Sequence, residues 1–305
     1  MSIQDRRGSN LTGSERVVFE DERVVEVWEG GDPAGAPVVF QPGTPSGRLQ
    51  GVLGDAAAKR CGVRLISVSR PGYGGSTYTS PSLASVGHDT LLVADELGVG
   101  EFAVLGASGG GPYAIATGLA DPQRVKAVGL AGAVGPWRLI EPPDPDDPDL
   151  PLLALVDAGD VAGALDGFRR QGAQAFDRML ALDDTAMIDT FFEGAPSEDL
   201  GWLDAEARVV WAADAREALA SYDGYARDNV AWGGAWDVDP TRLTVPTWLW
   251  YGEADRMVPP SQARWLAQRI PHATLIVRPG EGHGRTIFGH WAEMFSALGA
   301  GPPAP

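Results

Sequence analysis

The residues best suited to chemistry stand at positions 106–110, which read Gly-Ala-Ser-Gly-Gly. The apolar run 102–105 before them predicts a buried strand, and the residues that follow predict a helix. A serine on such a sharp strand-to-helix turn has a strained backbone and an exposed hydroxyl group. Ser108 is therefore a candidate nucleophile, and the flanking glycines would let the strand and the helix pack closely.

A serine hydroxyl is a weak nucleophile until a base takes its proton, and that base needs a carboxylate to orient it. Of the four histidines, we expect His88, His272 and His290 to be surface or packing residues. The segment 280–284, Gly-Glu-Gly-His-Gly, predicts a flexible loop directly after a strand. Such a loop can bring an imidazole to the C-terminal edge of a parallel sheet. His283 is therefore the candidate base.

Two carboxylates could orient that base. The segment 251–255, Tyr-Gly-Glu-Ala-Asp, also follows a predicted strand and contains Glu253 and Asp255. Asp255 is the better placed of the two, because it lies at the far end of the loop. The three candidates follow the order Ser, acid, His along the chain.

Strands and helices that alternate along the chain must position these residues. Parallel strands connected by helices form a sheet with both faces covered. The sequence therefore predicts an α/β fold with a mostly parallel eight-stranded sheet. We expect strands at 16–20, 23–29, 38–40, 63–68, 102–105, 125–130, 247–251 and 274–277, and helices at 48–60, 83–97, up to 120, 260–269 and 285–298.

Residues 137–239 interrupt this alternation. The stretch 141–149 has four prolines among acidic residues, which excludes a helix or a central strand there. From 152 to 232 the apolar spacing is helical and strand signals are absent. We therefore predict an all-helical domain, 137–239, inserted after the sixth strand of a core domain that comprises 1–136 and 240–305.

The charge of the chain is concentrated in this insert. The 305 residues include 41 acidic and 24 basic ones, a net charge of −17. Residues 137–239 hold 23 acidic and 7 basic residues, whereas the rest of the chain is nearly neutral. A composition of 44% hydrophobic and 21% charged residues excludes a disordered protein. The acidic balance argues against nucleic acid and anionic membranes as partners.

The compartment follows from what the sequence lacks. Cys61 is the single cysteine, so no intrachain disulfide or Cys-rich zinc site is expected. Residues 1–8 have no apolar segment typical of a secretory signal, and no apolar run approaches the length of a membrane span. We therefore expect a cytoplasmic protein; its oligomeric state is left open.

At these positions the chain resembles the α/β-hydrolase family, and the resemblance covers nearly everything outside the insert. It rests on the segments 106–110, 251–255 and 280–283, and on Arg-Pro-Gly-Tyr-Gly at 70–74. The resemblance implies that Ser108 is the nucleophile, His283 the general base and Asp255 its orienting acid. It also implies that the helical insert is a cap over the site.

The oxyanion of the reaction needs two backbone N–H donors. Gly109, at the start of the predicted helix, suits the first. In the family a loop after the third strand usually carries His-Gly, and the following residue supplies the second N–H. Here the dipeptide is Pro42-Gly43, so Thr44 is the expected donor, whereas Pro45 has no N–H.

Other site types are not indicated. Family members with an aspartate nucleophile are excluded by Ser108, and neither a nicotinamide-binding fingerprint nor a P-loop follows a predicted strand. We expect no cofactor and no metal.

The insert offers hypotheses about the substrate. Its aromatic residues could line an apolar pocket or form the core of the insert itself. Trp137, just past the sixth strand, is the candidate for substrate binding. The acidic residues could be a solvated helix face or an acidic mouth that favours neutral or cationic small molecules.

The expected function is a serine hydrolase that cleaves a carboxylic ester or a related acyl compound through an acyl-enzyme. An aminopeptidase or a C–C bond hydrolase would use the same triad. The same fold also hosts lyases, cyclising enzymes and cofactor-free oxygenases, and a binding protein that merely keeps the fold is a third class.

Overall fold

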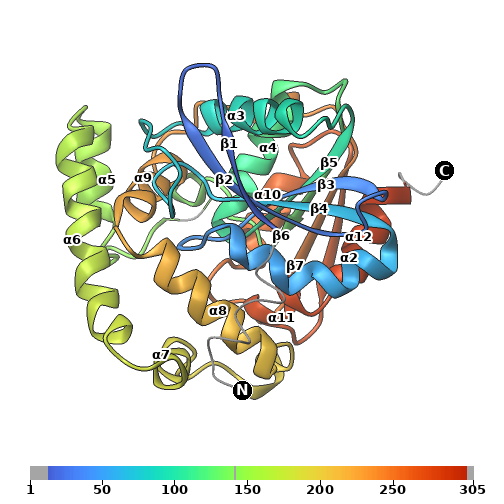
Figure 1. The fold of residues 1–305 in the computed structure, drawn as a ribbon. Helices are drawn as coiled ribbons and strands as arrows, with labels where there is room; N and C mark the ends of the chain where they lie inside the picture. Colours follow the sequence, from blue (N-terminus) through green and yellow to red (C-terminus); the bar gives the residue numbers. More distant parts are fainter. Residues whose placement is uncertain (1–12, 141, 301–305) are drawn as a thin grey trace.

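The computed structural model of the protein describes residues 13–140 and 142–300, and an eight-stranded sheet lies at its centre (Figure 1). Residues 1–8, in which no secretory signal is predicted, lie outside the described part. The strand order is β1-β2-β4-β3-β5-β6-β7-β8, and all pairs from β4 to β8 in this order are parallel, which confirms the predicted mostly parallel sheet. The strands are β1 (Ser14–Val18), β2 (Val24–Gly31), β3 (Ala36–Gln41), β4 (Val63–Val68), β5 (Phe102–Ala107), β6 (Val125–Ala131), β7 (Thr247–Gly252) and β8 (Ala273–Arg278).

The burial of each strand follows from its place in the sheet. β5 and β7 lie in the interior of the order and are buried at every residue, which explains their continuous apolar sequences. β1 forms an edge, pairs antiparallel with β2, and buries only Val17. It ends two residues before the predicted limit, because the turn to β2 places Glu22 at a φ of 67°.

Helices cover both faces of the sheet, as predicted (Figure 1). Neighbouring residues of one strand point to opposite faces, so Val39 and Val104 belong to one core and Phe40 and Leu105 to the other. The first core includes residues of α3 (Leu83–Glu96), α4 (Gly111–Ala120) and α10 (Pro260–Ala267). The second includes residues of α2 (Asp55–Cys61), α11 (His283–Phe288) and α12 (Trp291–Ala300), together with Val52 and Val210.

Two predicted helices are each divided in the structure. The one expected at 48–60 starts as a 3₁₀ helix, η1 (Arg48–Gly54), and continues as α2. In η1 the backbone comes so close to β4 that a Cβ on Gly51 would lie 2.4 Å from the Cβ of Ser67. The helix expected at 285–298 is two helices, because the N–H of Gly289 closes α11 on the carbonyl of Arg285 and α12 begins at Trp291.

Residues 137–239, which we call the helical insert, contain helices and no strand wherever the structure describes them. Several of their acidic residues act as N-caps: Asp160, Asp183 and Asp204 each accept a backbone N–H at the start of a helix. The division of the chain into two domains stays a prediction. The helices are η3 (Trp137–Leu139), α5 (Leu150–Asp157), α6 (Val161–Leu180), α7 (Asp184–Phe191), η4 (Ser197–Leu200), α8 (Ala205–Ala218) and α9 (Asp223–Gly233); η5 (Pro240–Arg242) then leads to β7.

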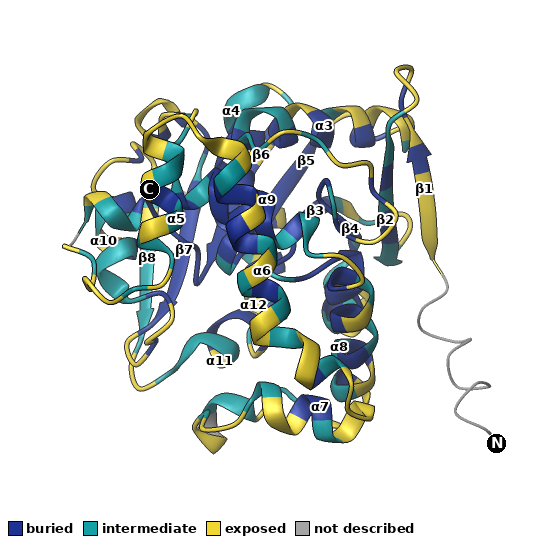
Figure 2. Cartoon of the chain, turned by 90° about the vertical axis from the view of Figure 1, so that its left-hand side faces the viewer, coloured by how far each residue is buried: buried dark blue, intermediate teal, exposed yellow. Residues whose placement is uncertain are grey.

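The insert has two small apolar clusters of its own. Phe168 and Leu153 centre one cluster between α5, α6 and α9, and Met187 centres the other, to which α6, α7 and α8 contribute. Figure 2 shows exposed residues on the outward sides of α6 and α7, whereas α9 lies behind α6 and is largely buried.

The helix α8 of the insert docks on the core through a buried carboxylate. Asp214 accepts hydrogen bonds from the hydroxyl of Ser46 and, at 3.1 Å, from the N–H of Gly47. Next to it, Glu217 and Glu26 both pair with Arg48. Burial, which outweighs the bonds from Ser46 and Gly47, raises the pKa of Asp214 to about 7.

Gly110 should tolerate no side chain, because a Cβ there would lie 2.1 Å from the carbonyl oxygen of Gln41. We expect Gly110→Ala to lower the free energy of unfolding by about 2 kcal/mol or more, as overpacking against rigid backbone does. Gly299→Ala is the matched control, since nothing lies within 4 Å of its Cβ position in α12. Urea unfolding of both variants measures the effect; equal stabilities would contradict the close packing.

Asp214 should make stability depend on pH. The pKa of its carboxyl is about 7 in the folded protein and near 3.8 in the unfolded chain, so its stabilising contribution is complete below about pH 4 and is lost as the pH rises through 7. We therefore expect the wild-type protein to lose stability relative to Asp214→Asn between pH 5 and pH 8. Urea unfolding at each pH measures the difference, and a difference that stays constant over this range would rule out the raised pKa.

Candidate active site

Ser108 lies where β5 gives way to α4, in the one-turn 3₁₀ helix η2 (Ser108–Gly110). Its φ is 50°, a left-handed conformation that costs a non-glycine residue of order 1 kcal/mol or more. Gly106 makes the turn sterically feasible, because a Cβ there would lie 2.6 Å from the carbonyl oxygen of Gly110. The strain at Ser108 is what turns its side chain out of the sheet, as the sequence predicts for a nucleophile.

The structure brings Ser108, His283 and Asp255 together although they lie far apart in the sequence. The Nε2 atom of His283 is 3.0 Å from the Oγ of Ser108, and its Nδ1 is 2.6 Å from an oxygen of Asp255. A proton on Nδ1 that is donated to Asp255 leaves Nε2 free to accept the serine proton. This chain of two hydrogen bonds can activate a hydroxyl group.

Asp255 is buried, and its other carboxylate oxygen accepts the N–H groups of Met257 and Val258, both at 2.9 Å. These bonds fix the carboxylate in front of the imidazole. Glu253, the competing acid, is exposed and does not contact His283. The structure therefore places Asp255, the acid preferred from the sequence, and not Glu253 against the imidazole.

His283 itself differs from expectation in one respect. The sequence predicts it in a flexible loop, but it is the first residue of α11. Asp199, in η4 of the insert, accepts the N–H groups of Gly284 at 3.1 Å and Arg285 at 2.8 Å. This carboxylate satisfies donors of the first turn that a helix leaves unpaired, which is why the segment is helical.

The other three histidines stay outside the cluster. His88 and His272 are exposed. His290 pairs with Glu281 at 2.9 Å, between α11 and α12.

The predicted oxyanion donors also lie next to Ser108. A Cβ on Gly43 would be 3.5 Å from the Cβ of Ser108, and one on Gly109 would be 2.5 Å from the Oγ1 of Thr44. The N–H of Thr44 donates to no group of the described ranges, so it is available to a ligand. Gly109 belongs to the first turn that leads into α4, where N–H groups have no intrahelical acceptor.

Sequence reasoning missed the side chains that hold Thr44. Its hydroxyl donates to Asp228 of α9 at 2.7 Å and accepts from Arg70 at 3.2 Å. The motif at 70–74 drew attention to the loop that contains Arg70. No pattern in a single sequence, however, indicates that Arg70 pairs with Asp228, which lies 158 residues further along the chain.

Trp137, the candidate for substrate binding, is half-buried in η3 and packs against the main core and against the α5–α6–α9 cluster. Its contact with a substrate stays a prediction. Four other aromatic residues of the insert pack together: Phe191, Phe192, Trp202 and Trp211. Of these, Trp202 and Trp211 also contact Phe288 of the core.

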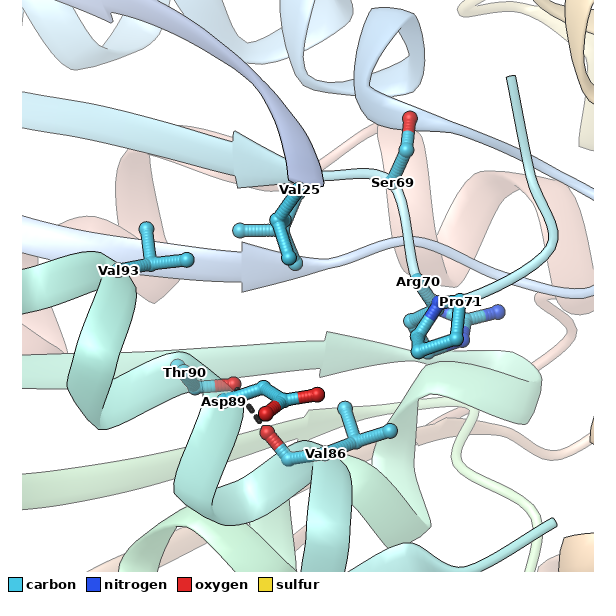
Figure 3. Close-up of a pocket in the computed structure, with 9 residues that line it drawn as sticks. Val25, Ser69, Arg70, Pro71, Val86, Asp89, Thr90 and Val93 are labelled. Carbon is cyan, nitrogen blue, oxygen red and sulfur yellow. Dashed lines mark hydrogen bonds between the residues drawn. The ribbon is translucent and has the colours of Figure 1, made fainter. Parts of the chain in front are cut away.

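The structure has two cavities near the candidate site, and neither is lined by Ser108 or His283. The first, of about 10 Å³, lies behind Arg70 and Pro71, between β2, β4 and α3, where Asp89 and Thr90 also line it (Figure 3). It has room for about one water molecule. The second, of about 170 Å³, lies between η1, α8 and α11, beside Trp202.

The part of the chain that the structure describes contains neither a cluster of metal-binding side chains nor a membrane-spanning helix. No group of three or more His, Cys, Asp and Glu side chains within 13–140 and 142–300 is arranged to hold a metal ion. Over the same ranges, no helix is both long and apolar enough to cross a membrane.

The chain is similar to known proteins in sequence and in fold. Residues 36–288 match the alpha/beta hydrolase fold family. Over 231 residues, 73% of this chain and 75% of the relative, the protein is 27% identical to the "Putative carbamate hydrolase RutD" of Caulobacter sp. (strain K31).

Solved structures show the same fold. The enol-lactonase from Burkholderia xenovorans LB400 has a TM-score of 0.63 at 18% identity, with 93% of this chain and 98% of that one covered. A thermophilic esterase from Thermogutta terrifontis has a TM-score of 0.63 at 19% identity, with 92% and 95% covered. Because the family match spans most of the sequence and all three residues of the cluster, the chain belongs to the α/β-hydrolase fold family.

Proposed function

We propose that the protein is a cofactor-independent serine hydrolase that cleaves a carboxylic ester or a related acyl compound through an acyl-enzyme. The observation that carries this proposal is the bonded chain from Asp255 through His283 to Ser108, with contacts of 2.6 and 3.0 Å. The hydrolases among the similar proteins, a carbamate hydrolase, an enol-lactonase and an esterase by name, support acyl chemistry.

In the first half of the reaction, the Oγ of Ser108 attacks the acyl carbon while Nε2 of His283 takes its proton. Asp255 holds the imidazole in the required tautomer and stabilises the imidazolium that forms. The negative charge that develops on the carbonyl oxygen is bound by the N–H groups of Gly109 and Thr44. His283 then gives its proton to the leaving alcohol, and an acyl group remains on Ser108.

In the second half, water takes the place of the alcohol. His283 accepts a proton from the water, which attacks the acyl carbon, and the same two N–H groups bind the new oxyanion. Collapse of this intermediate releases the acid and returns the proton to Ser108. Each group is used twice, and no group outside the five residues is needed.

For the substrate we propose a small molecule that is neutral or cationic and partly apolar, with Trp137 in contact with its apolar part. The basis is the net charge of −16 on residues 137–239, next to a nearly neutral core. A field of this sign lowers the local concentration of anions. Neither nucleic acid nor a membrane surface is a proposed partner, and a cytoplasmic location stays a prediction from the sequence.

Replacing the nucleophile tests the proposed function. We expect Ser108→Ala to abolish labelling by a fluorophosphonate probe and to lower ester hydrolysis at least about a thousandfold, since the other groups of a triad cannot act without the nucleophile. Ser296→Ala is the matched control: its hydroxyl lies on α12 and bonds to a carbonyl of the same helix. Labelling that persists in Ser108→Ala would refute the assignment.

The fate of solvent oxygen separates hydrolysis from the other reactions of this fold. In H₂¹⁸O, a hydrolase of this mechanism must place one ¹⁸O atom in each carboxylic acid released. Mass spectrometry of the product of the wild-type enzyme measures this incorporation. Turnover that depends on Ser108 without any ¹⁸O in the product would point instead to a lyase or a cyclising enzyme.

The charge of the substrate should affect the rate. For a neutral ester and an analogue that differs by one carboxylate, we expect a higher kcat/KM for the neutral ester at low salt. The ratio should fall towards one in 0.5 M NaCl, because salt screens charges beyond a few ångströms. A carboxylate analogue that reacts as fast as the neutral ester at low salt would sink the acidic-mouth hypothesis.

A further inference from the structure

A buried ion pair joins the helical insert to the loop that carries Thr44. Arg70, in the loop after β4, and Asp228, in α9, lie 2.6 Å apart, and both side chains are fully buried. Such a pair is stable only when its remaining donors and acceptors are also bonded. The partners that satisfy it are therefore informative.

On the Asp228 side, two tyrosines complete the bonding. The hydroxyl of Tyr113 donates at 2.6 Å to one oxygen, and that of Tyr73 donates at 3.0 Å to the other. Burial raises the pKa of both tyrosines, as does the charge of Asp228, so both hydroxyls remain donors. Burial alone would raise the pKa of Asp228, but Arg70 holds it below its ordinary value.

On the Arg70 side, the guanidinium group is hydrogen-bonded to the loop after β3. It donates to the carbonyl of Pro42 at 2.5 Å and to that of Gly43 at 2.7 Å. The hydroxyl of Thr44 donates to Asp228 at 2.7 Å, on the oxygen that Arg70 also binds. Three consecutive residues are thus fixed by one ion pair.

These hydrogen bonds determine where the N–H of Thr44 points. The carbonyl of Gly43 and the N–H of Thr44 belong to one peptide unit, which is planar and, being trans, directs the two groups in opposite directions. With the carbonyl held by Arg70, the N–H must point away from Arg70. The side chain of Thr44 is fixed as well, against Gly109.

We propose that Arg70 and Asp228 are positioning residues that aim the N–H of Thr44 at the oxyanion, and that the helical insert thereby contributes to catalysis through α9. This inference rests on the proposed hydrolase function. It explains why the loop works with Pro42-Gly43 in place of the family's His-Gly: the loop is held from outside by a charged pair. It also means that α9 cannot leave the core without releasing this donor.

The sharpest test removes only the hydroxyl that ties Thr44 to Asp228. Thr44→Val keeps the backbone N–H and the shape of the side chain, and it leaves Asp228 bonded to Arg70 and both tyrosines. We expect kcat to fall about 10- to 100-fold with KM changed less than about twofold. A misaimed N–H no longer stabilises the oxyanion of the transition state, but it leaves the binding of the substrate unchanged. Thr44→Ser should restore kcat to within about threefold of wild type.

Thr247→Val is the matched control. Thr247 is a buried threonine whose hydroxyl, like that of Thr44, donates one hydrogen bond, in its case to the carbonyl of Val245. It begins β7 at the opposite end of the strand from Asp255. Its kcat should stay at the wild-type value. Arg70→Lys and Asp228→Asn should lower kcat as Thr44→Val does, when kcat is calculated for the folded fraction that circular dichroism measures.

Several outcomes would overturn the proposal. Thr44→Val, folded Arg70→Lys and folded Asp228→Asn that all match Thr247→Val in kcat would remove the positioning role, and so would a loss that appears only in KM or a loss in Thr44→Val that Thr44→Ser does not restore. The rate of Ser108 phosphonylation by a fluorophosphonate, which also develops an oxyanion, should fall in parallel with kcat. If the wild-type protein is labelled at Ser108 but hydrolyses no ester, the proposed function fails, and this labelling rate still decides whether the loop is positioned as inferred.

Discussion

The ion pair between Arg70 and Asp228 connects three parts of the molecule whose relative positions define the candidate site: two loops of the core and the helical insert. Arg70 comes from the loop after β4, it binds the loop after β3, and Asp228 comes from an insert that begins after β6. Because the pair is fully buried, each of its donors and acceptors must be bonded, and a shift of any one segment leaves a charge uncompensated. Burying these charges costs free energy, and the bonds that compensate them hold the loop after β3 in one defined geometry.

The acidity of the insert has a more varied origin than either hypothesis from the sequence. Some of its carboxylates cap helices of the insert itself. Three others reach the core at the loops that surround Ser108: Asp199 caps α11, Asp214 binds the segment after Thr44, and Asp228 holds Arg70. The insert therefore docks on its core through carboxylates that accept from backbone or buried donors. The remaining acidic residues are spread along the insert, from the stretch 141–149 to Asp239, and give it its net charge.

Most of the fold and the main residues of the site could be predicted from local sequence patterns. Continuous apolar runs identified the buried strands, and the glycines around Ser108 identified the turn, since both signals arise within a few residues. The chain could not show the contacts of Arg70 with Asp228 or of Asp199 with α11, because these join segments over 80 residues apart. The division of the helix after Thr44 into η1 and α2 depends on close packing against β4, which no local propensity encodes.

The structure of a phosphonate adduct on Ser108 tests the central claim most directly, because its phosphoryl oxygen stands in for the oxyanion of the reaction. A crystal structure of the labelled protein should place that oxygen within hydrogen-bond distance of the N–H groups of both Thr44 and Gly109. The contacts of Arg70 with the carbonyls of Pro42 and Gly43 should be unchanged. An adduct whose oxygen points to solvent or to other donors, or a label on another residue, would contradict the account.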